Sequence, residues 1–157
     1  QKWLSTLGPE PLTDEFTVQT LKSNLHGKRS PIKSALLDQR VVSGLGNIYV
    51  SEILFRSKIS PIKTAAEVAG KSNRINSKLE RIFENTNQVI AEAIMVGGST
   101  ISDFRGVSGD SDLGYFAQNF RVFNREGEEC IEEKCKGKIL RIVQSGRSTF
   151  YCPKCQK

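Results

Sequence analysis

Four cysteines are the residues whose type and spacing most clearly indicate chemistry. They occur as two pairs in a chain of 157 residues, Cys130 with Cys135 and Cys152 with Cys155. Four thiolates that meet at one point form the ligand set of a tetrahedral zinc site, and a site closed by four sulfurs leaves no open position for catalysis. The spacing therefore predicts one structural Zn²⁺ bound by these four side chains.

Two other interpretations of the cysteines are disulfide bonds and a redox dithiol. Disulfides persist in oxidising compartments, and the first residues do not have the pattern of a secretory signal. A redox CPKC pair would need the start of a helix to lower its thiol pKa, but only two residues follow Cys155. Zinc is therefore the preferred interpretation.

The elements expected to position the cysteines are two short strands, KILRIV and STFYC, joined by QSGR. A hairpin this small cannot bury enough apolar surface to fold alone, which explains a requirement for metal. Arg147 lies in the expected turn, where its guanidinium would project as a fork for a phosphate. The alternative is an ordinary exposed arginine.

The formal net charge of +6 is unevenly distributed. Residues 22–63 hold eight Lys and Arg against two Asp and Glu, and residues 134–157 hold seven against none. Residues 64–133 between them hold seven basic and twelve acidic residues. Two basic segments around an acidic middle indicate a polyanionic partner, because neutralised phosphates release counterions. A solvated surface is the alternative.

The part before the cysteines is expected to be mainly α-helical. One helix is predicted to start after an N-cap at Thr13. The next is predicted to start after an N-cap at Ser30, which is followed by a proline. The turn GLGN separates the second helix from a third that ends before Pro61, and the longest periodic run covers 72–96.

Asn47 follows the glycine turn, where an N-cap would hold a phosphate on free backbone N–H groups or would simply cap a connection. The single histidine, His26, is interpreted as a surface residue, and Glu52 as an ion-pair partner within a helix. A long glycine-rich loop is expected after Gly98.

No run of residues is long and apolar enough to span a membrane, so a cytoplasmic location without membrane contact is expected. Because the chain begins with Gln1 rather than methionine, it is expected to be a fragment or a processed product.

Five stretches carry a resemblance to a known family: LGPEPL, SPIKSALLDQRVVSGLGNIYVSEILFRSKISP, GGSTISDF, GYFAQNFRVFNREGEEC and GRSTFYCPKCQK. From Leu7 to Lys157 the chain resembles the C-terminal half of bacterial formamidopyrimidine-DNA glycosylase. The resemblance implies a helical helix–two-turn–helix DNA-binding domain over residues 1–118, which includes a lesion-capping loop at about 104–115. A zinc-finger β-hairpin over 119–157 would follow, and the catalytic N-terminal domain would be absent from this chain.

The function implied by the resemblance is base-excision repair by a bifunctional DNA glycosylase and AP lyase that removes oxidised purines such as 8-oxoguanine and formamidopyrimidines. Its nucleophile, an N-terminal proline, is not in this chain. The chain is therefore expected to bind double-stranded DNA containing oxidised bases as a monomer, in the bacterial cytoplasm near the nucleoid, without cleaving it. Alternatives are an endonuclease VIII-type glycosylase for oxidised pyrimidines and a non-catalytic nucleic-acid-binding zinc module.

The resemblance also implies roles for individual residues. Arg147 would contact phosphates and take part in the final elimination. The other residues expected to contact DNA are Lys28, Arg29, Lys33 and Asn47. The lesion loop would include Phe104, Arg105, Gly106, Gly109, Gly114 and Tyr115. One departure is the first cysteine pair, which encloses four residues where the family has two, and this knuckle is expected to be looser.

Overall fold

The computed structural model describes residues 6–97 and 120–157, and within these ranges the chain is mainly α-helical. A two-stranded antiparallel sheet near the C-terminus is the other regular element. The elements are α2 (Val18–Leu25), α3 (Ile32–Leu37), α4 (Asn47–Ser57), α5 (Ala65–Ala69), α6 (Ser77–Gly97), β1 (Leu140–Gln144) and β2 (Arg147–Tyr151). The predicted combination of a helical part and a β-hairpin is confirmed.

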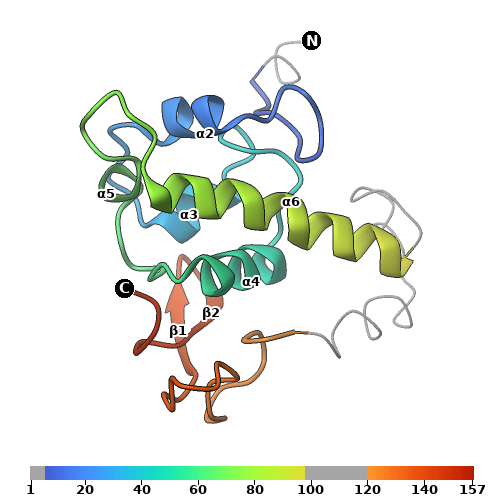
Figure 1. Ribbon diagram of the computed structural model, residues 1–157, viewed down its shortest axis with the longest axis vertical. Helices are drawn as coiled ribbons and strands as arrows, with labels where there is room; N and C mark the ends of the chain where they lie inside the picture. Colours follow the sequence, from blue (N-terminus) through green and yellow to red (C-terminus); the bar gives the residue numbers. More distant parts are fainter. Residues whose placement is uncertain (1–5, 98–119) are drawn as a thin grey trace.

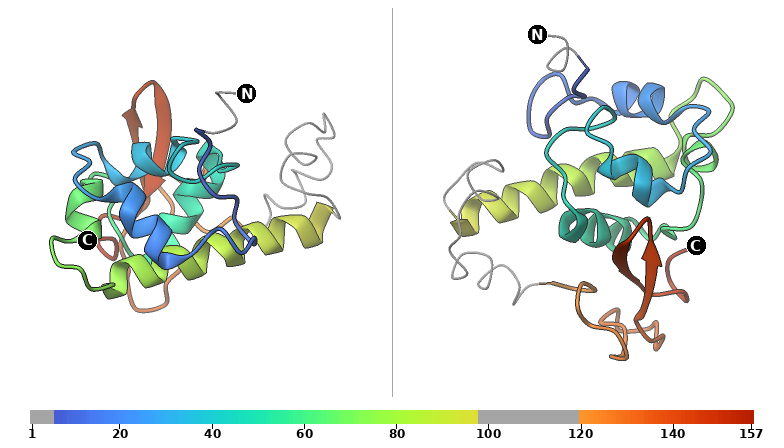
Figure 2. Two further views of the ribbon diagram at one scale, coloured as in Figure 1. Left: turned by 90° about the horizontal axis from the view of Figure 1, so that it is seen from above. Right: turned by 180° about the vertical axis from the view of Figure 1, so that it is seen from behind.

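Helix α6 crosses the middle of the helical part (Figure 1). It packs against α4 on one side and α2 on the other, and the β-hairpin packs against α4. Seen from other directions, the C-terminal end of α6 extends beyond the remaining helices (Figure 2). Within the helical part, α4 is therefore the main packing partner of the hairpin.

The first two predicted helix starts are wrong, by four residues and by one residue. Helix α2 begins at Val18, and its N-cap is Thr17, whose hydroxyl accepts a hydrogen bond from the Thr20 N–H. Thr13 instead donates its hydroxyl to the Glu10 carbonyl in a preceding turn. Helix α3 is capped by Pro31 rather than by the predicted serine before it, without a side-chain hydrogen bond. In α2, local hydrogen bonds between side chains and the backbone place the start of the helix later than predicted.

The connection between α3 and α4 covers residues 38–46 and contains two turns. Helix α4 begins at Asn47, and its N-cap is Gly46, so Asn47 is the first helical residue and not the predicted cap. The long helix α6 starts five residues later than predicted, where Asn76 accepts the Leu79 N–H. Helix α5 was not predicted, although its Thr64 and Glu67 form a capping box that the pattern T-x-x-E announces.

The buried apolar side chains form two clusters. The larger fills the space between the helices and includes Ile53 and Leu54 of α4. The smaller joins the hairpin to α4 and consists of Phe55, Val122, Cys130, Ile139, Phe150 and Cys152. Helix α4 thus contributes neighbouring residues to two separate cores.

The hairpin pairs Leu140 with Tyr151 at one end and Gln144 with Arg147 at the other. Its turn consists of Ser145 and Gly146, whose φ angles are 50° and 77°. Positive φ at both central residues is typical of the two-residue turn that matches the twist of paired strands. Arg147 is therefore the first residue of β2, beside the turn rather than within it.

In the described ranges, no helix combines the length and the apolar character that a membrane crossing requires. The predicted boundary between the two domains, at residues 118 and 119, lies outside the described residues.

Candidate zinc centre and nucleic-acid interface

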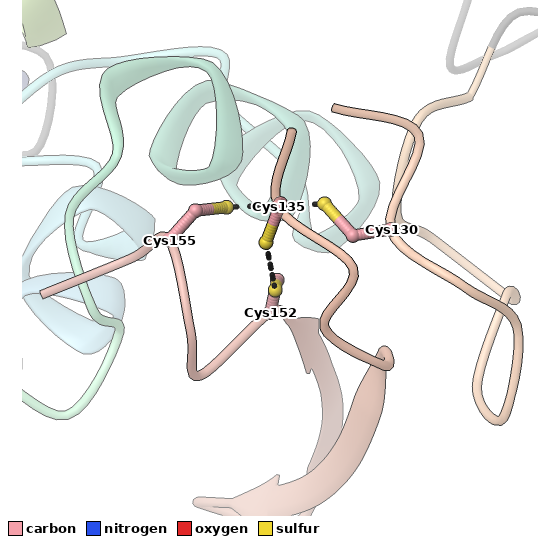
Figure 3. A group of neighbouring side chains, drawn as sticks. All are labelled: Cys130, Cys135, Cys152 and Cys155. Atoms are coloured by element: carbon pink, nitrogen blue, oxygen red, sulfur yellow. Dashed lines mark hydrogen bonds between the residues drawn. The ribbon is translucent and has the colours of Figure 1, made fainter. Parts of the chain in front are cut away.

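The four cysteine side chains point toward one another at the base of the hairpin (Figure 3). Their sulfur atoms all lie within 4.8 Å of one another. The Sγ atoms of Cys135 and Cys152 are 3.5 Å apart, and those of Cys130 and Cys155 are 3.9 Å apart. A tetrahedron with Zn–S bonds of about 2.3 Å has edges of roughly 3.8 Å. The sulfur positions therefore fit one structural zinc ion.

The same distances argue against the disulfide interpretation. All four thiols are free, and a disulfide needs a sulfur separation of about 2.05 Å. The redox interpretation lacks its structural context within the described residues, because Cys152 and Cys155 flank a turn rather than begin a helix. Structural zinc is the interpretation that the geometry supports.

The backbone around the sulfurs is fitted to them. A Cβ atom on Gly137 would lie 2.8 Å from the Cys152 sulfur and 3.3 Å from the Cys135 sulfur, so this position requires glycine. The Gly137 N–H lowers the pKa of Cys135, whereas burial raises the pKa of Cys130 to about 11. Burial also raises the pKa of Cys155. A bound cation is what stabilises these sulfurs as thiolates.

The longer first knuckle is held in two ways. The Cys135 N–H donates to the Glu132 carbonyl, which closes a turn inside the knuckle. The Glu132 carboxylate also lies 3.8 Å from the Lys58 ammonium at the end of α4. The four-residue knuckle is thus closed by a backbone turn and contacts the helical part.

Polar contacts fix the hairpin and the C-terminal residues against the helical part. The buried Gln156 accepts the Cys152 N–H and donates to the Ile59 carbonyl. At the other end of the hairpin, Gln144 donates to the Pro61 carbonyl. The hairpin is therefore held at its base and near its turn.

Two predicted phosphate contacts meet at one atom of the hairpin. The Nδ2 of Asn47 donates to the Ser148 carbonyl at 2.9 Å, and the Lys33 ammonium lies 3.5 Å from the same oxygen. Arg147 immediately precedes this carbonyl. Burial, and then the charge of Arg147, lower the pKa of Lys33 from 10.5 to about 8. The structure thus brings the two predicted basic segments together at Ser148.

A cleft lies beside this point, between the hairpin turn and the α3–α4 connection. Its walls are formed by Ser34, Leu37, Asp38, Gln39, Leu45, Gly46, Gln144, Ser145 and Arg147. The N-terminus of α4 borders the cleft and has no side-chain cap. A helix N-terminus and a guanidinium both attract anions. Lys33, in contrast, is fully buried rather than open to solvent.

The remaining predicted residues are less informative. Lys28 is half-buried near Asp38, whose pKa it helps to lower after the larger effect of Arg40. Arg29 is exposed just before α3, and His26 is exposed as predicted. The six predicted lesion-loop residues lie outside the described residues.

Glu52 has a different role from the one predicted. It is fully buried, and its carboxylate accepts the backbone N–H groups of Arg121, Val122 and Phe123 at 2.8 to 3.0 Å. It therefore anchors the segment that leads into the zinc centre, rather than pairing with a cation. A glutamate on the apolar side of a helix was the available signal, because such a side chain needs buried donors.

Two family descriptions match the chain. The formamidopyrimidine-DNA glycosylase H2TH domain matches residues 7–105, and the zinc finger found in FPG and IleRS matches residues 127–157. The chain belongs to the formamidopyrimidine-DNA glycosylase family. The zinc-finger match covers all four cysteines and so agrees with one structural zinc ion.

Two curated relatives named formamidopyrimidine-DNA glycosylase illustrate the match. The protein of Azorhizobium caulinodans is 50% identical over 154 residues, 98% of this chain and 52% of the relative. That of Roseobacter denitrificans is 49% identical over 156 residues, 99% of this chain and 52% of the relative. The chain therefore spans about half the length of the curated relatives it matches.

Solved structures of the family share the fold. The MutM (Fpg) protein of Thermus thermophilus is 36% identical with a TM-score of 0.77, and the match covers 99% of this chain and 55% of that one. The Lactococcus lactis Fpg in complex with DNA containing an abasic site is 32% identical with a TM-score of 0.80, over 99% and 54% of the two chains.

Proposed function

We propose that this chain is the DNA-binding part of a formamidopyrimidine-DNA glycosylase of base-excision repair. The full enzyme would remove oxidised purines from duplex DNA and then cleave the strand as an AP lyase. The observation that carries the proposal is the meeting of Lys33, Asn47 and the residue after Arg147 at one point beside a cleft. Family membership gives that point its chemical meaning.

In the proposed complex, a DNA phosphate enters the cleft between the hairpin turn and α4. It accepts hydrogen bonds from the Arg147 guanidinium and from the N-terminal end of α4, with Asn47 beside it. The buried ammonium of Lys33 contacts the Ser148 carbonyl and adds positive charge near the phosphate without contacting it. Lys28 and Arg29, just before α3, extend the basic surface.

In this proposal, α3, the two turns and α4 form the helix–two-turn–helix unit, within a domain over residues 1–118. The zinc-finger domain over 119–157 faces it across the cleft. Residues 104–115 cover a base that has been rotated out of the duplex. The zinc ion supplies a fixed scaffold for the hairpin, and its closed sulfur shell takes no part in bond cleavage.

Arg147 is assigned mainly to phosphate binding. A free guanidinium has a pKa above 12 and is a poor proton donor, whereas its planar fork matches two phosphate oxygens. The nucleophile of the full enzyme belongs to a part of the protein outside this chain, so the chain alone binds DNA and does not cleave it.

DNA titrations at several salt concentrations test the proposal. Loss of one phosphate contact flattens the log–log salt dependence by about one unit. Arg147→Ala is expected to weaken binding and flatten the slope, and Asn47→Ala to weaken binding without changing it. Lys138→Ala is the matched control, because Lys138 is an exposed cation that precedes the same hairpin and does not line the cleft. Equal effects of Arg147→Ala and Lys138→Ala would contradict the assigned cleft.

Borohydride treatment tests the division of labour. A Schiff-base intermediate would be trapped as a covalent complex with DNA that contains 8-oxoguanine or an abasic site. We expect no trapped complex with this chain. A trapped complex would mean that an amine within these 157 residues acts as the nucleophile.

A further inference from the structure

The α3–α4 connection is in contact with a segment that precedes α2. The Gly8 N–H donates to the Gln39 carbonyl at 2.8 Å, and the Ser43 N–H donates to the Pro9 carbonyl at 3.0 Å. The two segments lie side by side (Figures 1 and 2). Gly8 and Pro9 are therefore bonded to both of the turns that lead to α4.

Gly8 has no room for a side chain. A Cβ atom there would lie 2.6 Å from the Arg40 carbonyl oxygen and 2.7 Å from the carbonyl carbon and oxygen of Val41. These are backbone atoms, which cannot rotate away as a side chain can. The φ angle of Gly8 is not in the left-handed region, so glycine is required here for close approach alone.

The connection has little freedom to absorb a displacement. From inside, the Gln39 side chain accepts the Gly44 N–H and donates to the carbonyls of Leu37 and Leu45. From the other side, Asn24 of α2 donates to the Val41 carbonyl. These hydrogen bonds tie the first turn to Gly44 and Leu45, just before α4 begins.

We propose that Gly8 is a positioning residue for the phosphate cleft. By letting the backbone at residues 8 and 9 approach the turns, it sets where Gly46 and Asn47 lie relative to Arg147. The inference rests on the proposed DNA binding, and it adds a residue that neither lines the cleft nor carries a charge. It also predicts that the segment around Gly8 responds to DNA, because a phosphate that orders the start of α4 should slow amide exchange along the connection.

The first test compares Gly8→Ala with Leu7→Ala, whose side chain is exposed on the same segment. Binding to a duplex with an abasic-site analogue is measured by fluorescence anisotropy. Gly8→Ala is expected to bind about tenfold more weakly, because the phosphate loses one hydrogen bond from an uncharged donor at the start of α4, and the salt slope is expected to stay unchanged. Leu7→Ala is expected to bind within about twofold of the parent. A folded, zinc-loaded Gly8→Ala chain with the parent's affinity would overturn the proposal.

Amide hydrogen exchange separates positioning from a general loss of stability. In Gly8→Ala without DNA, exchange is expected to accelerate at residues 43–46 and to stay unchanged in α6. Equal acceleration in both regions would mean a global effect and would overturn the proposal. Because this comparison needs no DNA, it shows whether Gly8 positions the start of α4 even if the parent chain fails to bind DNA, so failure of the inference and failure of the proposed function are distinguishable.

The parent chain provides the measurement that does not depend on the variant. If Gly8→Ala does not fold, exchange of the Gly8 and Ser43 amides is measured in the parent with and without the abasic-site duplex. Slower exchange of both amides in the complex supports the proposal. Exchange unchanged by bound DNA contradicts it.

Discussion

The helical part and the zinc finger are held together by different interactions. The helical part has a continuous apolar core to which all five described helices contribute. One face of α4 lies outside this core. The finger has six buried residues in its cluster, and two of these are cysteine ligands while a third, Phe55, belongs to α4. The folding of the finger therefore depends on a metal and on a side chain from α4.

This difference has a consequence for DNA binding. Asn47 is positioned by the large core, whereas Arg147 is positioned by the small one. Polar contacts bridge the two regions, from Asn47 to the Ser148 carbonyl and from Gln156 to the Ile59 carbonyl. One side of the proposed cleft should thus be robust and the other conditional on zinc.

Zinc removal should produce the largest effect. Structural zinc contributes about 10–16 kcal/mol of apparent binding free energy in finger peptides, and the finger's cluster has only four apolar side chains besides its two cysteines. Cys152→Ser is expected to lose zinc and DNA affinity while circular dichroism retains most of the helical signal. Lys154→Ala, in the same knuckle, is expected to retain one zinc per chain. A Cys152→Ser chain with full zinc content would refute the four-sulfur site.

Two adjacent residues of α4 test whether the cores are separate. Leu54 belongs to the helical core and Phe55 to the finger cluster. Leu54→Ala should lower the unfolding free energy of the helical part by about 2–5 kcal/mol and leave zinc affinity nearly unchanged. Phe55→Ala should chiefly weaken zinc binding. Thermal unfolding and zinc competition measure the two quantities, and indistinguishable profiles would show one cooperative core.

The pH dependence of DNA binding should report on Lys33, which lies between the two regions. Its pKa is about 8 in the folded chain, and phosphate favours the charged form, so affinity should fall by up to about tenfold per pH unit above pH 8. Lys33→Ala should remove this fall, and Lys78→Ala should not. Titrations from pH 6.5 to pH 9.5 measure it, and an unaltered profile in Lys33→Ala would exclude Lys33 as the responsible group.

The same shift affects stability with a defined sign. A lysine whose folded pKa is lowered binds fewer protons when folded than when unfolded between about pH 8 and 10.5. The full cost of burying the charged side chain is therefore present below pH 8. The free energy of unfolding should rise as the pH increases through that window.

The smallest effect should come from the ion pair between Lys58 and Glu132. Both side chains are about half exposed, 51% and 40%, and such pairs contribute roughly 0–1 kcal/mol. Glu132→Gln is expected to change zinc affinity by less than about threefold, and less still at high salt. A larger loss in zinc competition would mean that this pair holds the first knuckle in place.

The sequence was informative where one local pattern determines the structure. The cysteine spacing predicted the metal site, and the glycine turn with Asn47 predicted the start of α4 to within one residue. Thr13 misled because several polar residues nearby can cap a helix, and only the structure selects Thr17. The burial of Lys33 could not be predicted, because the hairpin that covers it is more than a hundred residues away in the chain.

The contacts of Glu52 and Gly8 could not be predicted from the sequence either. The partners of Glu52 are backbone groups of residues 121–123, and those of Gly8 are backbone groups near residue 40. Backbone partners leave no signature in side-chain type or spacing. Such contacts become visible only when the chain is folded.

The two-sided use of α4 limits how the length of this helix can change. Each residue inserted into an α-helix rotates everything after it by about 100°. A single insertion between Glu52 and Phe55 would leave the carboxylate in place but turn the aromatic ring away from the finger. A deletion would rotate it equally far in the other direction. Helix α4 should therefore tolerate substitutions far better than insertions or deletions. The rotation between its residues is fixed, because one face must contact the helical core while another contacts the zinc finger.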